Sequence, residues 1–202
     1  RQQRDPYVKS AVAARLGSRA HFKLEQLDRR FSLLRPQMAV LELGAAPGGW
    51  TRYLARRVTD GLIVAVDNKP MPVPNGVVFA CIDIYSEGFE QAVAELIGAR
   101  RLDLVLSDMA PNISGVTVAD QAATMGLVEL ATQCAMRWLK QGGALVVKMF
   151  QGEGVDQWVA GARGSFAKVV LAKPAASRTQ SREVYGVATG FTGSLRLKDL
   201  VR

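Results

Sequence analysis

The chain has 202 residues, 49% of them hydrophobic, and its 26 Lys and Arg residues against 18 Asp and Glu give a net charge of +8 at pH 7. This length suits one domain with a substantial apolar core, and no apolar run approaches the roughly 20 residues of a membrane span. Residues 1–35 hold nine basic and three acidic residues. Because the charge is concentrated there, nucleic acid is favoured as a partner over a merely solvated basic face.

Helical and strand patterns alternate along the chain after a polar, basic arm at residues 1–17. Ser18 is a suitable N-cap for a helix to about Phe31, with an apolar stripe of Ala20, Leu24 and Leu27. Apolar runs predict buried strands. The predicted strands are 38–43, 62–66, 77–82, 102–106, 144–147, 166–171 and 183–189, and the later helices are 49–58, 86–98, 120–139 and 155–163.

This alternation predicts a parallel sheet with helices on both faces. The last two strands are joined by the basic loop 173–182, which has no helix long enough for a crossover, so we expect an antiparallel edge hairpin. That ending differs from a plain dinucleotide-binding fold and matches its methyltransferase variant. We expect one domain over 1–202, with an N-terminal helical segment at 18–35, a core at 36–191 and a tail at 192–202.

The stretch VLELGAAPGGW, residues 40–50, joins the first strand to the next helix through a glycine-rich turn. Gly44 and Gly48 can adopt positive φ and let a ligand approach the main chain, and the helix N-terminus offers unpaired N–H groups. The pattern is neither G-x-G-x-x-G nor a P-loop, so a ligand with adenosine but no phosphate, such as S-adenosylmethionine, fits best. The alternative is a tight connection whose glycines serve only the turn.

Ionisable residues follow four of the predicted strands: Asp67, Asp83, Asp108 and Lys148. Ligands of doubly wound sheets bind beyond the carboxyl ends of the strands, so we expect these groups at one crevice. Asp67 can accept the ribose hydroxyls of a nucleoside and Asp83 the adenine amino group. Each aspartate alone is more often a turn or cap residue, but together the four favour a binding and catalytic site.

Lys148 follows the apolar run 144–147, where an unpaired ammonium is costly. Asp108 is its natural partner, and Glu183 can reach it from the hairpin. The alternative to a catalytic base is a structural ion pair.

The chain resembles the FtsJ/RrmJ-like ribosomal RNA 2′-O-methyltransferases from about Asp5 to Phe191. The resemblance implies a Rossmann-like, S-adenosylmethionine-dependent fold with a seven-stranded sheet and an antiparallel last strand. Gly17 and the tail after Phe191 depart from the family pattern, away from the expected site. The matching stretches are SRAHFKL (18–24), LGAAPGGW (43–50), SDMAPNISG (107–115), VVKMFQGEG (146–154) and SREVYGVATG (181–190).

The same resemblance implies a Lys-Asp-Lys-Glu catalytic set at Lys23, Asp108, Lys148 and Glu183. It implies methylation of a uridine ribose in large-subunit ribosomal RNA within the ribosomal particle. Lys148 would take the proton of the 2′-hydroxyl, and Asp108 would orient it. The cofactor contacts that the resemblance implies are Gly48, Trp50, Asp67, Asp83 and Asp108. Gly44 is added because of its place in the glycine turn.

RNA is expected along the N-terminal helix and the loop 173–182, through phosphate and 2′-hydroxyl contacts. The candidate residues are Arg19, Arg29, Arg30, Lys173, Arg178 and Arg182. For Phe22, Phe150 and Tyr185 core packing is favoured over stacking on a base. His21 is expected on the helix surface, and Cys81 and Cys134 as reduced core thiols. A zinc site is not expected.

The sequence also bears on several rival functions. An NAD-linked oxidoreductase is disfavoured by the glycine spacing, and an amino-directed methyltransferase by Asp108-Met109-Ala110-Pro111 in place of an Asn/Asp-Pro-Pro-aromatic tetrad. An enzyme that methylates a pyrimidine carbon is also disfavoured, because it needs a cysteine nucleophile near the site and neither cysteine is expected there. A 2′-O-methyltransferase of transfer RNA or messenger RNA caps and a non-catalytic ribosome-assembly factor remain as alternatives. We expect a monomeric, cytoplasmic enzyme of bacterial type, or a mitochondrial relative without its presequence.

Overall fold

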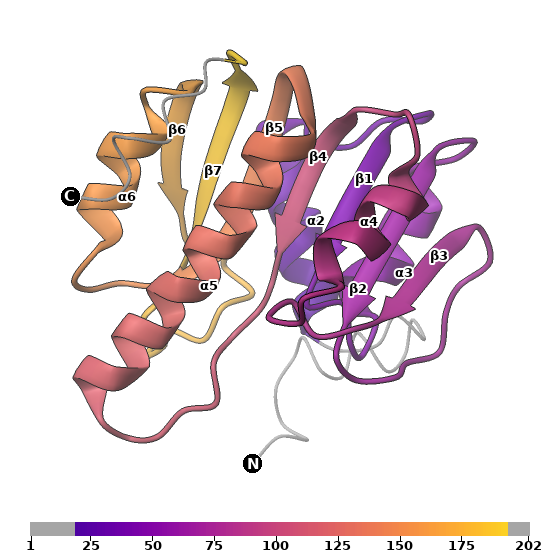
Figure 1. Cartoon of the computed structure of the whole chain (residues 1–202). Coiled ribbons are helices and arrows are strands. Elements are labelled where there is room, and N and C mark those ends of the chain that lie inside the picture. The colour runs from indigo at the N-terminus through magenta and orange to yellow at the C-terminus, as the bar shows by residue number, and fades with distance from the viewer. Residues whose placement is uncertain (1–18, 194–202) are drawn as a thin grey trace. The chain divides into compact units, whose positions relative to one another are not determined.

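The computed structural model describes residues 19–193, which form two compact units (Figure 1). The first contains residues 19–100 together with the segment 174–181, and the second contains 101–173 and 182–193. The predicted basic arm, the capping Ser18 and all of the tail beyond residue 193 lie outside the described residues. Within 19–193 no helix has the length and hydropathy that a membrane crossing requires.

The first unit is a three-stranded parallel sheet with helices on both faces. Its strands run in the order β3-β2-β1, and α4 lies on the face opposite α2 and α3 (Figure 1). β1 is buried along its whole length because every residue but Glu42 is apolar. The elements are α2 (Ala20–Phe31), β1 (Ala39–Leu43), α3 (Gly49–Arg57), β2 (Leu62–Asp67), β3 (Val77–Cys81) and α4 (Phe89–Ile97).

The second unit has four strands in the order β4-β5-β7-β6. β4 and β5 are parallel, whereas β7 runs antiparallel to both of its neighbours. The elements are β4 (Leu102–Ser107), α5 (Thr117–Trp138), β5 (Leu139–Phe150), α6 (Val155–Ala162), β6 (Phe166–Ala172) and β7 (Glu183–Phe191).

Helices α5 and α6 cover the same face of this second sheet. The Trp158 indole of α6 donates to Thr132 Oγ1 of α5 at 2.9 Å. The same indole lies over Gly186 of β7, where an added Cβ would come within 2.5 Å of the ring. Gly186 is therefore the residue that lets α6 pack closely on β7.

The predicted fold class is confirmed: seven strands, of which the last is antiparallel, with helices packed on them. Every predicted strand and helix is present, with bounds that differ by a few residues. The largest difference is β5, which begins at Leu139 rather than 144. Asp120 lies in the first turn of α5 instead of before it, and its carboxylate accepts N–H groups from Ser114 and Gly115 of the preceding loop.

Two predictions about single residues are wrong. Cys81 is exposed, because β3 lies at the edge of the sheet and is only partly covered, whereas Cys134 is buried as expected. His21 is 3% exposed rather than on the helix surface. The face of α2 that packs on α3 carries polar residues as well as leucines. The apolar stripe alone therefore gave the wrong prediction for His21.

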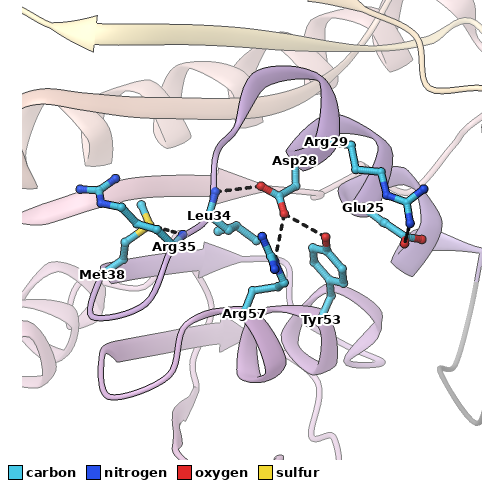
Figure 2. A network of polar contacts seen from close by, with 8 residues as sticks. All are labelled: Glu25, Asp28, Arg29, Leu34, Arg35, Met38, Tyr53 and Arg57. Carbon is cyan, nitrogen blue, oxygen red and sulfur yellow. Dashed lines mark hydrogen bonds and ion pairs between the residues drawn. The ribbon is translucent and has the colours of Figure 1, made fainter.

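Helices α2 and α3 are joined by buried polar contacts centred on Asp28 (Figure 2). The Asp28 carboxylate accepts the Leu34 N–H at 2.8 Å, the Tyr53 hydroxyl at 2.9 Å and Arg57 Nε at 3.3 Å. Burial, followed by the bond to Asp28, raises the pKa of Tyr53 above its usual value. The carboxylate is therefore well satisfied although it is almost fully buried.

His21 extends this helix contact toward the start of α3. Its ring meets Tyr53 edge to face, with ring centres 5.1 Å apart, and Nδ1 has no hydrogen-bond partner. Burial lowers the pKa of His21 below 6.5, as do Arg56 and Arg52, against the opposing effects of Glu25 and a Gly49 backbone hydrogen bond. The imidazole is thus held in its neutral form.

This lowered pKa predicts a loss of stability in acid. The unfolded chain binds a proton at His21 near pH 6.5 and the folded chain only at lower pH, so the free energy of unfolding should fall as the pH drops below about 6.5. His21→Phe should show a smaller fall between pH 7.5 and 5.5, measured by urea unfolding. An equal fall in the variant and the native chain would contradict a buried, neutral His21.

Candidate active site

The glycine turn of the first unit has the backbone geometry that the sequence predicts. Gly44 and Gly48 adopt φ of 76° and 91°. The N–H groups of Gly44 and Ala45 both donate to the Val66 carbonyl, at 2.9 and 3.1 Å, which fixes the turn to β2. A Cβ at Gly48 would lie 3.1 Å from the Arg52 guanidinium. This turn therefore brings bare main chain and the first N–H groups of α3 to the end of β1.

Asp67 supports that turn from the end of β2. Its carboxylate accepts the Ala46 N–H at 2.9 Å and the Lys69 N–H at 2.8 Å, one on each oxygen. A carboxylate has about four acceptor positions, so Asp67 can still accept hydroxyl groups of a ligand. Asp83 is exposed beyond β3 and accepts the Tyr85 N–H at 2.9 Å. This contact is of the turn type that the sequence offers as the alternative for each aspartate.

Trp50, an implied cofactor contact, lies at the beginning of α3 with its side chain buried. Its indole is 2% exposed and donates to the Ala20 carbonyl of α2 at 2.8 Å. The side chain thus joins the beginning of α3 to the beginning of α2, the helix that carries Lys23.

The second unit brings together Asp108, Lys148 and Tyr185. Lys148 Nζ lies 3.3 Å from Asp108 Oδ1 and also donates to the Asp108 backbone carbonyl. The Tyr185 hydroxyl donates to the same Oδ1 at 2.7 Å. The side chains of Lys148 and Asp108 are only 11% and 17% exposed, so each charge depends on the other for compensation.

The antiparallel pairing of β5 with β7 explains this cluster. Lys148 lies opposite Tyr185 and Phe150 opposite Glu183, so all four side chains share one face of the sheet. Glu183 is 8% exposed. Burial first, then the charges of Asp108 and Glu183, raise the pKa of Tyr185 well above its usual value. Tyr185 thus keeps its proton and donates it to the Asp108 carboxylate.

The loop after β5 is held by two residues that donate to its carbonyl groups. Gln121 of α5 donates to the Phe150 and Glu153 carbonyls at 3.1 and 2.7 Å. Arg182 donates through Nε to the Gln151 carbonyl at 3.0 Å. Arg182, a predicted RNA-binding residue, therefore also braces the chain that follows Lys148.

The other predicted RNA-binding residues are all in the first unit except Lys173. Arg29 is exposed and paired with Glu25 at 2.7 Å, and Arg30 lies over the Phe31 ring. Arg178 and Lys173 are exposed. Arg19 is half-buried and donates to the Ala176 carbonyl at 3.3 Å. Two further arginines, Arg56 and Arg57, end α3 and are exposed.

Of the predicted catalytic set, Asp108, Lys148 and Glu183 lie in the second unit and Lys23 lies on α2 of the first. Residues 19–193 contain no group of three His, Cys, Asp or Glu side chains that could hold a metal ion.

The FtsJ-like methyltransferase family model matches residues 16–191 of the chain. The chain belongs to this family. It is accordingly a methyltransferase, and the family resemblance expected from the sequence is confirmed.

Curated relatives agree with the family model. The chain is 47% identical over 190 residues to "Ribosomal RNA large subunit methyltransferase E" of Stutzerimonas stutzeri. The aligned region covers 94% of this chain and 92% of the relative. It is 50% identical over 189 residues to the protein of that name from Marinobacter nauticus, covering 93% and 91%. A solved structure from Plasmodium falciparum, described as a ribosomal RNA methyltransferase, superposes with a TM-score of 0.79 at 25% identity, over 88% of this chain and 99% of that one.

Sequence reasoning missed the two roles of Tyr185 and Gln121 in this methyltransferase. The signal for Tyr185 was present, because the strand pairing of a hairpin determines which residues lie opposite Lys148. For Gln121 there was none, since a glutamine in the first turn of a helix has many possible partners.

Tyr185→Phe tests the hydroxyl that Asp108 accepts. Loss of one buried hydrogen bond to a charged group should lower the free energy of unfolding by about 1–3 kcal/mol, measured by urea denaturation. Tyr85→Phe is the matched control, because Tyr85 is 68% exposed. An effect of the same size in both variants would argue against a special role for the Tyr185 hydroxyl.

Proposed function

We propose that the chain transfers a methyl group from S-adenosylmethionine to the 2′-hydroxyl of a uridine in large-subunit ribosomal RNA, within the ribosomal particle. The observation that carries the proposal is the Asp108–Lys148–Tyr185 cluster, a nearly buried lysine held by a carboxylate at the ends of β4 and β5. The names of the relatives support ribosomal RNA as the substrate class. We further propose that the enzyme works as a monomer in a bacterial cytoplasm.

The residues of the first unit fit S-adenosylmethionine chemically. The turn at Gly44 and Gly48 presents main chain without a Cβ in the way and leads into the N-terminus of α3, which suits the carboxylate of an amino-acid moiety. The Asp67 carboxylate retains acceptor capacity for ribose hydroxyls, and Asp83 is exposed for the adenine amino group. Neither a P-loop lysine nor another phosphate-binding motif is present.

The bound cofactor would supply an electrophilic methyl group on a positively charged sulfur. The protein's part is then to position the ribose and remove its 2′-hydroxyl proton. Lys148 would accept this proton at Nζ as the free amine. Asp108, held by the Tyr185 hydroxyl, orients Nζ, and Lys23 and Glu183 hold the ribose and balance the charge.

RNA would lie on the basic surface of α2 and the loop 173–182, with the ends of α3 extending it. The exposed residues there are Arg30 of α2 and, in the loop, Lys173 and Arg178. Contacts of this kind are made mainly to phosphates and do not depend on the base sequence. Selection of the target uridine would then come from the shape of the ribosomal particle.

Lys148→Ala should lower the methyl-transfer rate by at least about 100-fold, because general base catalysis contributes roughly 10²–10⁴-fold. Its dissociation constant for S-adenosylmethionine, measured by calorimetry, should be nearly unchanged. Lys168→Ala removes an exposed lysine of β6 and is the control. Near-normal turnover in Lys148→Ala would remove Lys148 from the mechanism.

Charge reversal at the basic loop tests the RNA surface. Arg178→Glu should weaken RNA binding and reduce the slope of log affinity against log salt by about one, as expected for one lost phosphate contact. Arg100→Glu, an exposed change of equal charge after α4, should have a smaller effect. Filter binding over a salt series measures both, and equal slopes for Arg178→Glu and the native chain would exclude this RNA path.

A further inference from the structure

The segment 174–181 joins β6 to β7 but packs with the first unit, although both strands belong to the second. Two side chains of α2 hold it by the backbone of Ala176. Gln26 Oε1 accepts the Ala176 N–H at 3.0 Å, and Arg19 Nη1 donates to the Ala176 carbonyl at 3.3 Å. Ala176 is 0% exposed, so protein groups must satisfy both of its backbone polar atoms.

The positions of these two residues on α2 single out one face of the helix. Arg19, Lys23 and Gln26 follow one another at intervals of four and three residues, so they form a single stripe along α2. Lys23 therefore lies between the two residues that hold Ala176. The opposite face of α2, with His21, Leu24 and Asp28, is the one buried against α3.

The held segment also leads directly into the other part of the predicted catalytic set. Seven residues after Ala176 the chain reaches Glu183, the first residue of β7, and Tyr185 follows two positions later. Within the segment, the N–H groups of Ser177 and Ser181 donate to the carbonyls of Pro174 and Arg178, at 2.9 and 3.0 Å. The second of these turns lies between Ala176 and β7.

We propose that Gln26, together with Arg19, is a positioning residue for methyl transfer. By holding both backbone groups of Ala176, the pair aligns the segment 174–181 with the Lys23 face of α2 and sets the approach of the chain to Glu183. Only residue 182 separates this segment from Glu183, so a change at Gln26 is expected to reach Glu183 along the chain. This inference rests on the proposed function, because it gives Lys23 and Glu183 their catalytic roles.

The test compares variants of the full-length chain at Gln26. Gln26→Met keeps the length of the side chain but removes the acceptor, and Gln26→Glu retains an acceptor. Gln91→Met changes an exposed glutamine of α4 and is the matched control. Methyl transfer to ribosomal particles, cofactor affinity and hydrogen exchange of the Ala176 amide are measured for each.

We expect Gln26→Met to lower kcat by about tenfold, because misplaced catalytic groups slow the chemical step, and to leave the KM for S-adenosylmethionine unchanged. Exchange at the Ala176 amide should become faster. Gln26→Glu should restore most of the activity, and Gln91→Met should match the native chain. In a Glu183→Gln background the effect of Gln26→Met on kcat should shrink, because residues that act together are not additive.

Two results would overturn the inference: faster exchange at Ala176 with native kcat, or a full tenfold loss that persists in the Glu183→Gln background. If Gln26→Met does not fold, Arg19→Met removes the other half of the contact, and kcat at saturating RNA is judged by the same criteria. A native chain that fails to methylate ribosomal particles would refute the proposed function instead, and amide exchange would still show whether Gln26 holds Ala176.

Discussion

The need to compensate a charge at the end of a buried strand governs the chemistry of this protein. Lys148 follows the apolar residues of β5, where an isolated ammonium would be costly. Asp108 provides the opposite charge, and Tyr185, placed by the antiparallel register of β7, donates to the same carboxylate. If the register shifted by one residue, Tyr185 would face the other side of the sheet. The reversed direction of the last strand is therefore a requirement of the site as well as a feature of the fold.

Helix α2 has a comparable position in the first unit, because both of its long faces are engaged. One face is joined to α3 by the Asp28 contacts (Figure 2). His21 and the Trp50 indole make further contacts between the two helices. The other carries Lys23 and holds Ala176. Movement of α2 would disturb the glycine turn and the segment before β7 together. A short helix thus connects two separate segments of the first unit.

The sequence was sufficient to predict every strand and helix of the described residues, because apolar runs and glycine turns alternate clearly. It also indicated that Asp108 and Lys148 would meet, since the ends of parallel strands lie at one edge of a sheet. Contacts between polar side chains and distant backbone were not predictable. Gln26 with Ala176 is one such contact, and buried His21 is another, because helical periodicity shows where apolar residues gather and not which polar ones join them.

The chain passes between the two units three times, after residues 100, 173 and 181. Neither unit is therefore encoded by one continuous stretch. A fragment that ends before residue 174 lacks part of the first unit and also lacks β7 of the second. A fragment that starts at residue 101 still contains the segment 174–181, which belongs to the first unit. No single truncation of the chain yields one complete unit alone, so the folding of either unit has to be studied in the full-length chain.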